Sequence, residues 1–227
     1  MAELSKQDQF KQAAAQAAAS LVLDGMIVGL GTGSTAKFAV DFLGQRMREG
    51  LRFIGIPTSE ETAKQARELG IPLGTLGEHP SLDLAIDGAD EIVEGPLHLV
   101  KGRGGALLRE KIVEASAKEL IIIADDSKLV AQLGTKMPLP VEVNPFGWEA
   151  TAKRLEALGA KPKLREGFTT DGGHIILDCN FGLIADPLAL QRQLDACVGV
   201  VEHGLFLGMA AQAFVATADG MRHLKLH

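Results

Sequence analysis

Short apolar runs alternate with longer segments whose apolar residues recur at helical spacing. In the first part of the chain the runs predict strands at residues 26–30, 53–56, 82–86, 97–100 and 120–124. Helices are predicted between them at residues 36–49, 60–69 and 106–118, and an Ala-rich helix capped by Ser5 precedes the first strand. Continuous apolar strands that alternate with helices are typical of a parallel sheet covered on both faces.

The pattern changes after a proline-rich connection at residues 137–140. Strands predicted at residues 141–143, 161–165, 174–179 and 198–202 combine with helices at 146–158 and 187–196 in the order βαββαβ. This is the split βαβ order of a small α+β, ferredoxin-like domain. Strands at residues 209–215 and 221–226 form a predicted terminal hairpin that can rejoin the first sheet.

Composition narrows the class of protein. The chain has 227 residues, 46% of them hydrophobic, which is enough for a sizeable core. Its net charge of -6 argues against a nucleic-acid partner, and it has neither a signal-peptide pattern nor an apolar run long enough for a membrane span. Cys179 and Cys197 form no disulfide framework, so we expect a cytoplasmic protein.

A glycine-rich loop, Gly31-Thr32-Gly33-Ser34-Thr35, connects the first predicted strand to a helix. Backbone N–H groups in such a loop, together with the helix N-terminus, favour a phosphate site over a merely tight turn. The spacing also fits a dinucleotide fingerprint, but the second strand ends in Pro57-Thr58-Ser59, without the acidic residue that a ribose needs. A Walker A lysine is missing as well.

Acidic and basic residues gather around the third and fourth predicted strands. Asp87-Gly88-Ala89-Asp90-Glu91 follows one strand, Lys101 to Gly105 ends the next, and Glu110 lies on the helix behind them. A carboxylate beside a lysine suits a proton-transfer enzyme that acts on a hydroxy-carbonyl compound. The alternative for the aspartates is a turn or helix cap, and Glu110 taken alone reads as a solvated helix residue.

Two further alternatives remain open at these motifs. A Mg²⁺ site on Asp87, Asp90 and Glu91 is conceivable, although the nearby lysine can serve as the electrophile without it. Lys128 reads either as a helix-start residue or as a cation for the substrate. The histidines are scattered without metal-ligand spacing, so no metal and no cofactor are expected.

These motifs, in this order, resemble the type A family of ribose-5-phosphate isomerases over nearly the whole chain. The resemblance rests on Gly31 to Thr35, Asp87 to Glu91, Lys101 to Lys111, Asp125 to Lys128 and the Pro-Leu-Pro-Val-Glu-Val segment at 138–143. It implies a metal-independent, cytoplasmic isomerase that is a homodimer or homotetramer. Arg103 is a departure, because many members have glycine there.

The resemblance also assigns roles to positions of this sequence. Glu110 corresponds to the general base, and Asp87 and Lys101 to the other catalytic positions. The substrate-binding positions are Thr32, Gly33, Ser34, Thr35, Asp87, Gly88, Ala89, Asp90, Lys101, Gly102, Arg103, Gly104, Lys128 and Lys11.

The function implied is interconversion of D-ribose 5-phosphate and D-ribulose 5-phosphate through an enediolate, in the non-oxidative pentose phosphate pathway. The partner is then a small sugar phosphate, not a membrane or a nucleic acid. Residues 1–131 with 206–227 are expected to form the Rossmann-like catalytic domain, and residues 132–205 a small α+β lid or oligomerisation domain.

Two competing functions are a related amino-sugar phosphate isomerase and a non-catalytic sugar-phosphate sensor. The first calls for a histidine near the base, and His98, which lies close to the motifs, reads as structural. A sensor usually carries a DNA-binding helix-turn-helix, for which the roughly 25 residues before the first strand are too few.

Overall fold

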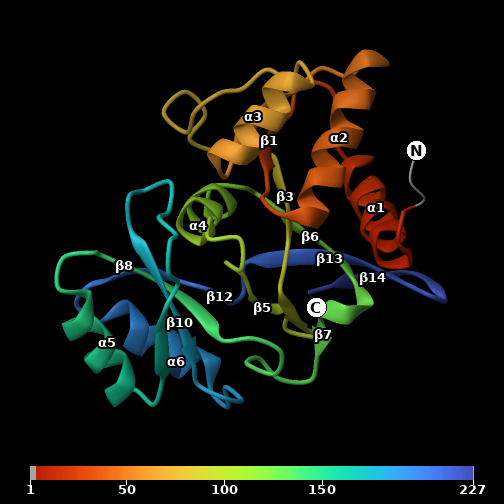
Figure 1. The fold of residues 1–227 in the computed structure, drawn as a ribbon. Helices are drawn as coiled ribbons and strands as arrows, with labels where there is room; N and C mark the ends of the chain where they lie inside the picture. The colour runs from red at the N-terminus through yellow and green to blue at the C-terminus, as the bar shows by residue number, and fades with distance from the viewer. Residues whose placement is uncertain (1–3, 227) are drawn as a thin grey trace.

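The computed structural model describes residues 4–226 and contains a six-stranded sheet in the order β14-β13-β6-β3-β1-β2 (Figure 1). Its neighbouring strands are parallel except for the antiparallel pair β13–β14. The strands are β1 (Ile27–Leu30), β2 (Ile54–Pro57), β3 (Leu84–Gly88), β6 (Leu120–Asp125), β13 (Ala210–Thr217) and β14 (Gly220–Lys225). The predicted parallel sheet and the terminal hairpin that rejoins it are therefore confirmed.

Helices α1 (Lys6–Ala19) and α2 (Ser34–Arg48) pack on one face of this sheet, and α3 (Glu60–Glu68) packs beside α2 and β2. Alanines line the buried side of α1, which lets this helix lie close to the strands. On the other face, Val113 of α4 (Leu107–Ala115) packs against Ile56 and Leu82. None of the helices within residues 4–226 is sufficiently long and apolar to span a membrane.

Part of the second face is covered by a small sheet rather than by a helix. The strand expected at residues 97–100 forms as β5 (His98–Val100), but it belongs to a four-stranded sheet, β12-β5-β4-β7, and not to the parallel one. The turn between β4 (Glu91–Val93) and β5 is too short for a crossover, so the two strands pair antiparallel. The other members are β7 (Leu129–Val130) and β12 (Leu205–Phe206).

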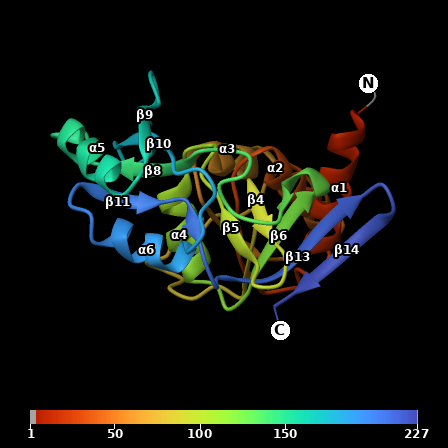
Figure 2. The same cartoon turned by 90° about the horizontal axis from the view of Figure 1, so that it is seen from below.

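The small α+β domain has the predicted βαββαβ order, in strands β8 (Leu139–Val143), β9 (Lys161–Leu164), β10 (Ile175–Asn180) and β11 (Val200–His203) with helices α5 (Trp148–Ala157) and α6 (Pro187–Asp195). Its sheet is antiparallel in the order β11-β8-β10-β9. Helix α4 lies between this domain and the large sheet, as Figure 2 shows, and contacts β11. The boundaries at 131/132 and 205/206 stay predictions, and residues 1–3 and 227 of the larger domain lie outside the described residues.

Glu91 has a structural role in the connection to β8. The sequence left open a Mg²⁺ site that included Glu91, but its fully buried carboxylate accepts hydrogen bonds from the backbone N–H groups of Gly134 (2.7 Å), Lys136 and Met137 (3.2 Å). A short 3₁₀ turn (η1, Asp126–Lys128) and β7 precede this connection. Glu91 therefore fixes the chain where it leaves the large sheet.

Glu91→Gln is expected to lower the free energy of unfolding by about 2–4 kcal/mol, because the amide replaces an acceptor with a donor that faces N–H groups. Urea unfolding monitored by circular dichroism measures the change. The matched control is Glu94→Gln, which removes an exposed ion pair with Arg222 and should cost less than about 1 kcal/mol. Equal losses in the two variants would contradict the anchoring role.

Candidate functional site

The site lies where the carboxyl ends of β1, β3 and β6 meet. The chain runs from β1 to β2 on one side and then returns to β3 on the other side of β1, so the strand order reverses between β1 and β3. Ligands of open α/β sheets bind at this kind of switch point. The glycine-rich loop after β1 and Asp87 at the end of β3 are thereby brought to one place.

A cavity of about 300 Å³ opens at this point. Its lining comes from four chain segments that are distant in sequence: the loop after β1, the end of β3, the loop before α4 and the turn after β6. The lining residues are Thr32, Gly33, Ser34, Thr35, Gly88, Ala89, Asp90, Lys101, Gly102, Arg103, Gly104, Glu110 and Lys128. Of the catalytic and substrate-binding positions that the family resemblance assigns, all except Asp87 and Lys11 line this cavity.

The glycine-rich loop packs directly on Asp87. A Cβ atom on Gly31 would lie 2.2 Å from the Asp87 carboxyl, so no larger residue fits there. The N–H of Thr32 donates to Asp87 Oδ1 at 3.0 Å, and the next turn begins α2 at Ser34. The N-terminus of α2 therefore points its free N–H groups and its partial positive charge at the cavity, which is an arrangement suited to an anion.

Lys101 is the centre of a buried cluster of charged groups. Its Nζ lies 3.0 Å from Asp87 Oδ2, 3.5 Å from Glu110 Oε2 and 3.1 Å from Glu114 Oε1. It also donates a hydrogen bond to the carbonyl oxygen of Gly88 at 2.7 Å. All four side chains are almost completely buried, so one ammonium group faces three carboxyl groups in a low-dielectric environment.

Burial and mutual repulsion change how these groups titrate. Burial raises the pKa of Glu110 to about 8, with Asp87 and Asp90 adding to the effect and the Lys101 ammonium opposing it. Burial alone would lower the pKa of Lys101, but the three carboxyl groups together raise it well above its ordinary value. Lys101 therefore stays charged, while Glu110 can gain and lose a proton near neutral pH, as a general base must.

Glu114 is a member of the cluster that the sequence interpretation missed. It lies one helical turn after Glu110, and residues four apart in a helix share a face. Once Glu110 is assigned to the site, this spacing is a signal that Glu114 points the same way. The isolated sequence did not reveal it because α4 also carries charged residues that point elsewhere, such as Lys111.

The small domain holds the loop that follows Lys101. The Arg165 guanidinium donates to the carbonyl oxygens of Gly102 (3.3 Å) and Arg103 (3.0 Å) and is itself paired with Asp178. The ring of Phe168 packs so closely on Gly105 that a Cβ atom there would lie 2.2 Å from it. Nothing in the sequence spacing pointed to these contacts, which join residues about sixty positions apart.

Three of the predicted substrate-binding positions, Lys11, Lys128 and Arg103, differ in how they lie relative to the cavity. Lys11 pairs with Asp8 at 3.1 Å and does not line the cavity. Lys128 does line it, from η1. The backbone N–H of Arg103 donates to Asp90 Oδ2 at 3.0 Å, which orders the loop, and Arg103 is exposed at the cavity rim.

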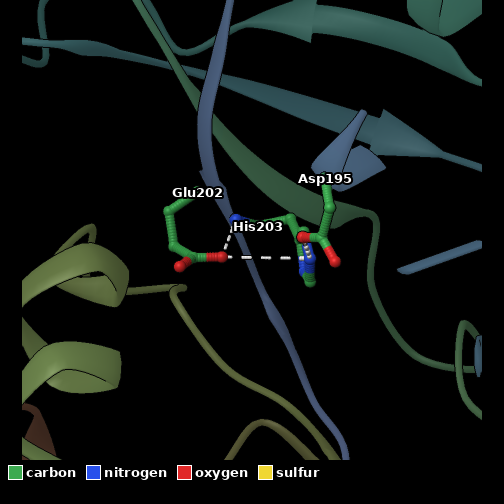
Figure 3. Close-up of side chains that lie close together, drawn as sticks. All are labelled: Asp195, Glu202 and His203. Carbon is green, nitrogen blue, oxygen red and sulfur yellow. Dashed lines mark hydrogen bonds and ion pairs between the residues drawn. The ribbon is translucent and has the colours of Figure 1, made fainter. Parts of the chain in front are cut away.

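A second cluster, Asp195, Glu202 and His203, has metal-like spacing (Figure 3). Its chemistry does not suit a metal, because Nδ1 of His203 accepts from the Leu205 N–H at 3.2 Å. Nε2 must then carry the ring proton, and it donates to Asp195 Oδ1 at 3.0 Å. The Lys111 ammonium also pairs with Glu202 at 2.5 Å. Burial first, and then Lys111, lower the pKa of His203, which favours the same neutral ring. The cluster joins α4 to β11 and α6.

The carboxyl groups of Asp87, Glu110 and Glu114 also lie within metal-binding distance of one another. Their common neighbour is the Lys101 ammonium, which occupies the position where a cation would sit. This donor set therefore favours an ammonium-centred site over a metal centre.

Comparisons with known proteins agree on one family. The sequence model described as Ribose 5-phosphate isomerase A (phosphoriboisomerase A) matches residues 54–220. A protein named ribose-5-phosphate isomerase A from a Synechococcus species is 64% identical over 98% of this chain and 99% of its own length. The relative of that name from Gloeobacter violaceus is 60% identical over 96% of both chains.

Solved structures give the same result. The structure of ribose 5-phosphate isomerase A from Methanocaldococcus jannaschii has a TM-score of 0.92 and 41% identity, and covers 96% of this chain and 99% of its own. A D-ribose-5-phosphate isomerase in complex with phospho-erythronic acid has a TM-score of 0.94 and 38% identity, with 97% of this chain and 100% of its own covered.

The raised pKa of Glu110 predicts a pH-dependent cost in stability. Between its ordinary value near 4.5 and about 8, the folded protein keeps a proton that the unfolded chain releases. The resulting stabilisation is present at low pH and is lost as pH rises through this window. Relative to Glu110→Gln, which stays neutral, the wild type should lose about 4–5 kcal/mol of unfolding free energy by pH 8.

Urea unfolding at several pH values measures this difference. Glu156→Gln, on an exposed side of α5, is the control, and its difference from wild type should stay constant with pH. A constant difference for Glu110→Gln as well would contradict the buried-base account.

Proposed function

Because this chain belongs to the ribose 5-phosphate isomerase A family, we propose that Glu110, Asp87 and Lys101 carry the reaction of that family. The protein is an aldose-ketose isomerase that interconverts D-ribose 5-phosphate and D-ribulose 5-phosphate, a step of the non-oxidative pentose phosphate pathway. One observation supports the assignment of residues most directly. A buried base, Glu110, reaches the cavity beside an ammonium group that cannot lose its proton at neutral pH.

The phosphate group of the sugar binds at the N-terminus of α2 in this proposal. The loop of Thr32 to Thr35 supplies backbone N–H groups and hydroxyls there, and Lys128 lies at the same cavity. The phosphorylated sugar acid in the complex of the related isomerase supports a sugar phosphate as the ligand. Gly88, Ala89, Asp90 and the loop from Gly102 to Gly104 surround the remainder of the sugar.

Asp87 assists opening of the sugar ring in this proposal by exchanging a proton with the ring oxygen; its buried carboxylate is next to the cavity, where it accepts from the N–H of the lining residue Thr32. Glu110 in its ionised form then removes the proton from C2, and the electron pair left behind forms the C1–C2 double bond of an enediolate. The proton on O2 moves to O1, Glu110 returns its proton to C1, and C2 becomes the carbonyl carbon of the ketose. Lys101 stabilises the negative charge that develops on the oxygen of C1 and then on that of C2.

The competing functions are less compatible with this site. An amino-sugar phosphate isomerase needs a histidine near the base, and the described residues that line the cavity include no histidine. His98 lies on β5, away from the lining, where burial lowers its pKa. A non-catalytic sensor has no need of a base whose pKa is raised toward neutrality by burial.

Glu110→Gln should lower kcat by about 10²- to 10⁴-fold, because the amide keeps the shape of the side chain and cannot accept a proton. The KM for ribose 5-phosphate should change little. Ketose formation, followed by absorbance in buffer with excess EDTA, measures both constants. The EDTA also tests the metal-independent reaction, which should proceed at an unchanged rate.

Glu156→Gln serves as the control for an unrelated helix carboxylate and should retain full activity. Wild-type-like turnover in Glu110→Gln would refute Glu110 as the base. Loss of wild-type activity in EDTA would refute the metal-free mechanism.

A cytoplasmic homodimer or homotetramer is also part of the proposal. Support for assembly comes from the small domain, where Phe146 is 94% exposed and Val198 is 73% exposed. Both flank the backbone hydrogen bond from Asn144 to Gly199 and so lie at one end of the domain. The two cysteines are free thiols, which suits a reducing compartment.

Light scattering should give the mass of a dimer or tetramer for the wild type. Phe146→Asp should shift the equilibrium toward monomer at micromolar concentration, since it places a charge in an apolar contact. The control is Met221→Asp, at an exposed apolar residue on β14, which should leave the mass unchanged. A wild-type monomer would contradict the proposed assembly.

A further inference from the structure

Glu114 is the most hidden carboxyl group of the cluster. Its Oε1 lies 3.1 Å from Lys101 Nζ, closer than the 3.5 Å of Glu110 Oε2, and its side chain has no exposed surface. Glu110 lines the cavity, whereas Glu114 does not. Glu114 therefore cannot touch the sugar, and any role in the reaction must act through Lys101, Asp87 or Glu110.

The cluster has more acceptors than donors. Four of its buried carboxyl oxygens accept no hydrogen bond of good geometry: Asp87 Oδ2, Glu110 Oε2, and Oε1 and Oε2 of Glu114. The ion pair with Lys101 is the contact that three of them have, and Oε2 of Glu114 is not part of it. Three ionised carboxylates around one ammonium would bury two uncompensated negative charges, which is strongly unfavourable. A proton on one carboxyl group removes a charge and converts an acceptor into a donor.

Hydrogen bonding indicates where this proton resides. Asp87 already accepts hydrogen bonds from the backbone N–H groups of Thr32 (3.0 Å) and Gly88 (2.6 Å), and such bonds favour its ionised form. Glu110 must be able to ionise at the cavity if it is the base. Glu114 has no backbone donor, and one of its carboxyl oxygens lies within 4.8 Å of an oxygen of Asp87 and of an oxygen of Glu110.

We propose that Glu114 is a positioning residue, protonated in the resting enzyme, that donates a hydrogen bond to Asp87 and leaves the charge of Lys101 for Glu110 and the reacting oxygens. This inference rests on the proposed function. A protonated acid next to Asp87 weakens the negative potential at Glu110. The hydrogen bond to Asp87 also weakens the ion pair between Asp87 and Lys101, so that the ammonium stays close to Glu110.

The surroundings of Glu114 agree with this state. It lies beside Lys101, Asp87 and Glu110, and on its own helix Lys111 is engaged by Glu202 of β11. Lys111 is thus occupied and does not supply a second free cation. Burial raises the pKa of Glu114 well above its ordinary value, against the pull of Lys101 and with Asp87 adding to the rise.

The two possible states of Glu114 predict opposite shifts in the pKa of Glu110. If Glu114 is a neutral donor, its removal in Glu114→Met exposes Glu110 to a stronger field from Asp87, and the pKa of Glu110 rises. If Glu114 is ionised, its removal takes away a negative charge, and the pKa of Glu110 falls. The acid limb of kcat/KM reports this pKa in the free enzyme.

The experiment measures kcat, KM and the pH profile of kcat/KM for Glu114→Met and Glu114→Gln. For Glu114→Met we expect an acid limb at higher pH and kcat at neutral pH lower by about 10- to 100-fold, with KM little changed. Glu114→Gln keeps a hydrogen-bond donor for Asp87. Its acid limb of kcat/KM should therefore lie at the wild-type pH, and its kcat should be within about 3-fold of wild type. Ile112→Gln, on the exposed side of α4, is the control for the helix itself.

The proposal would be overturned if the acid limb of kcat/KM moved to lower pH in either variant, or did not move in Glu114→Met. So would a Glu114→Gln profile that matches that of Glu114→Met. Far-UV circular dichroism establishes that each variant is folded. If Glu114→Met does not fold, infrared spectra test the protonation of Glu114 instead. The Glu110→Gln variant should show a carboxylic-acid band from Glu114, and this band should be absent from the double variant Glu110→Gln/Glu114→Gln. Persistence of the band in the double variant would overturn the proposal.

Failure of the proposed function gives a different result. It would appear as full activity of Glu110→Gln, whatever the Glu114 variants do. Failure of the present inference would appear with Glu110→Gln inactive and the Glu114 pH profiles unshifted or reversed.

Discussion

The Lys101 ammonium is the charge on which the rest of the site depends. It lies within 3.5 Å of three buried carboxyl groups that come from the end of β3 and from α4. Its own backbone is held by Gly204, which accepts from the Lys101 N–H at 2.9 Å just before β12. Removal of this ammonium would leave several buried negative charges without compensation, so the fold and the chemistry share one requirement.

The small domain participates in this arrangement rather than only being attached to it. Arg165 and Phe168 hold the loop after Lys101, and Lys111 ties α4 to Glu202 and the carbonyl oxygen of His203 on β11. Helix α4 is thus fixed on one side by the large sheet and on the other by the small domain. Its carboxyl groups keep their distances to Lys101 because both sides of α4 are held.

Much of the fold could be predicted from the sequence, for physical reasons. The strand at residues 120–124 is apolar on both faces, which only a buried parallel strand needs, and the positions after such strands must gather at one sheet edge. The separate sheet that contains β5 was missed because it depends on pairing with β12, more than a hundred residues later. The roles of individual site residues came from the family resemblance and not from spacing.

The residues that escaped prediction share one property: their roles depend on burial. The sequence of α4 does not reveal that Glu114 is inside while Lys111 is engaged by another domain, since helical spacing alone gives no direction for the face. Arg165 likewise directly follows β9, and only the packing of two domains brings it to Gly102. Lys11 was assigned by resemblance alone, and its substrate role stays a prediction.

The most direct measurement of the central claim is the titration of Glu110 by carboxyl ¹³C NMR in the wild type and in Lys101→Met. If Lys101 is the compensating charge of the cluster, the wild-type pKa is about 8 and the pKa in Lys101→Met is higher, because only desolvation and repulsion remain. A pKa that is unchanged or lower in Lys101→Met would contradict the account.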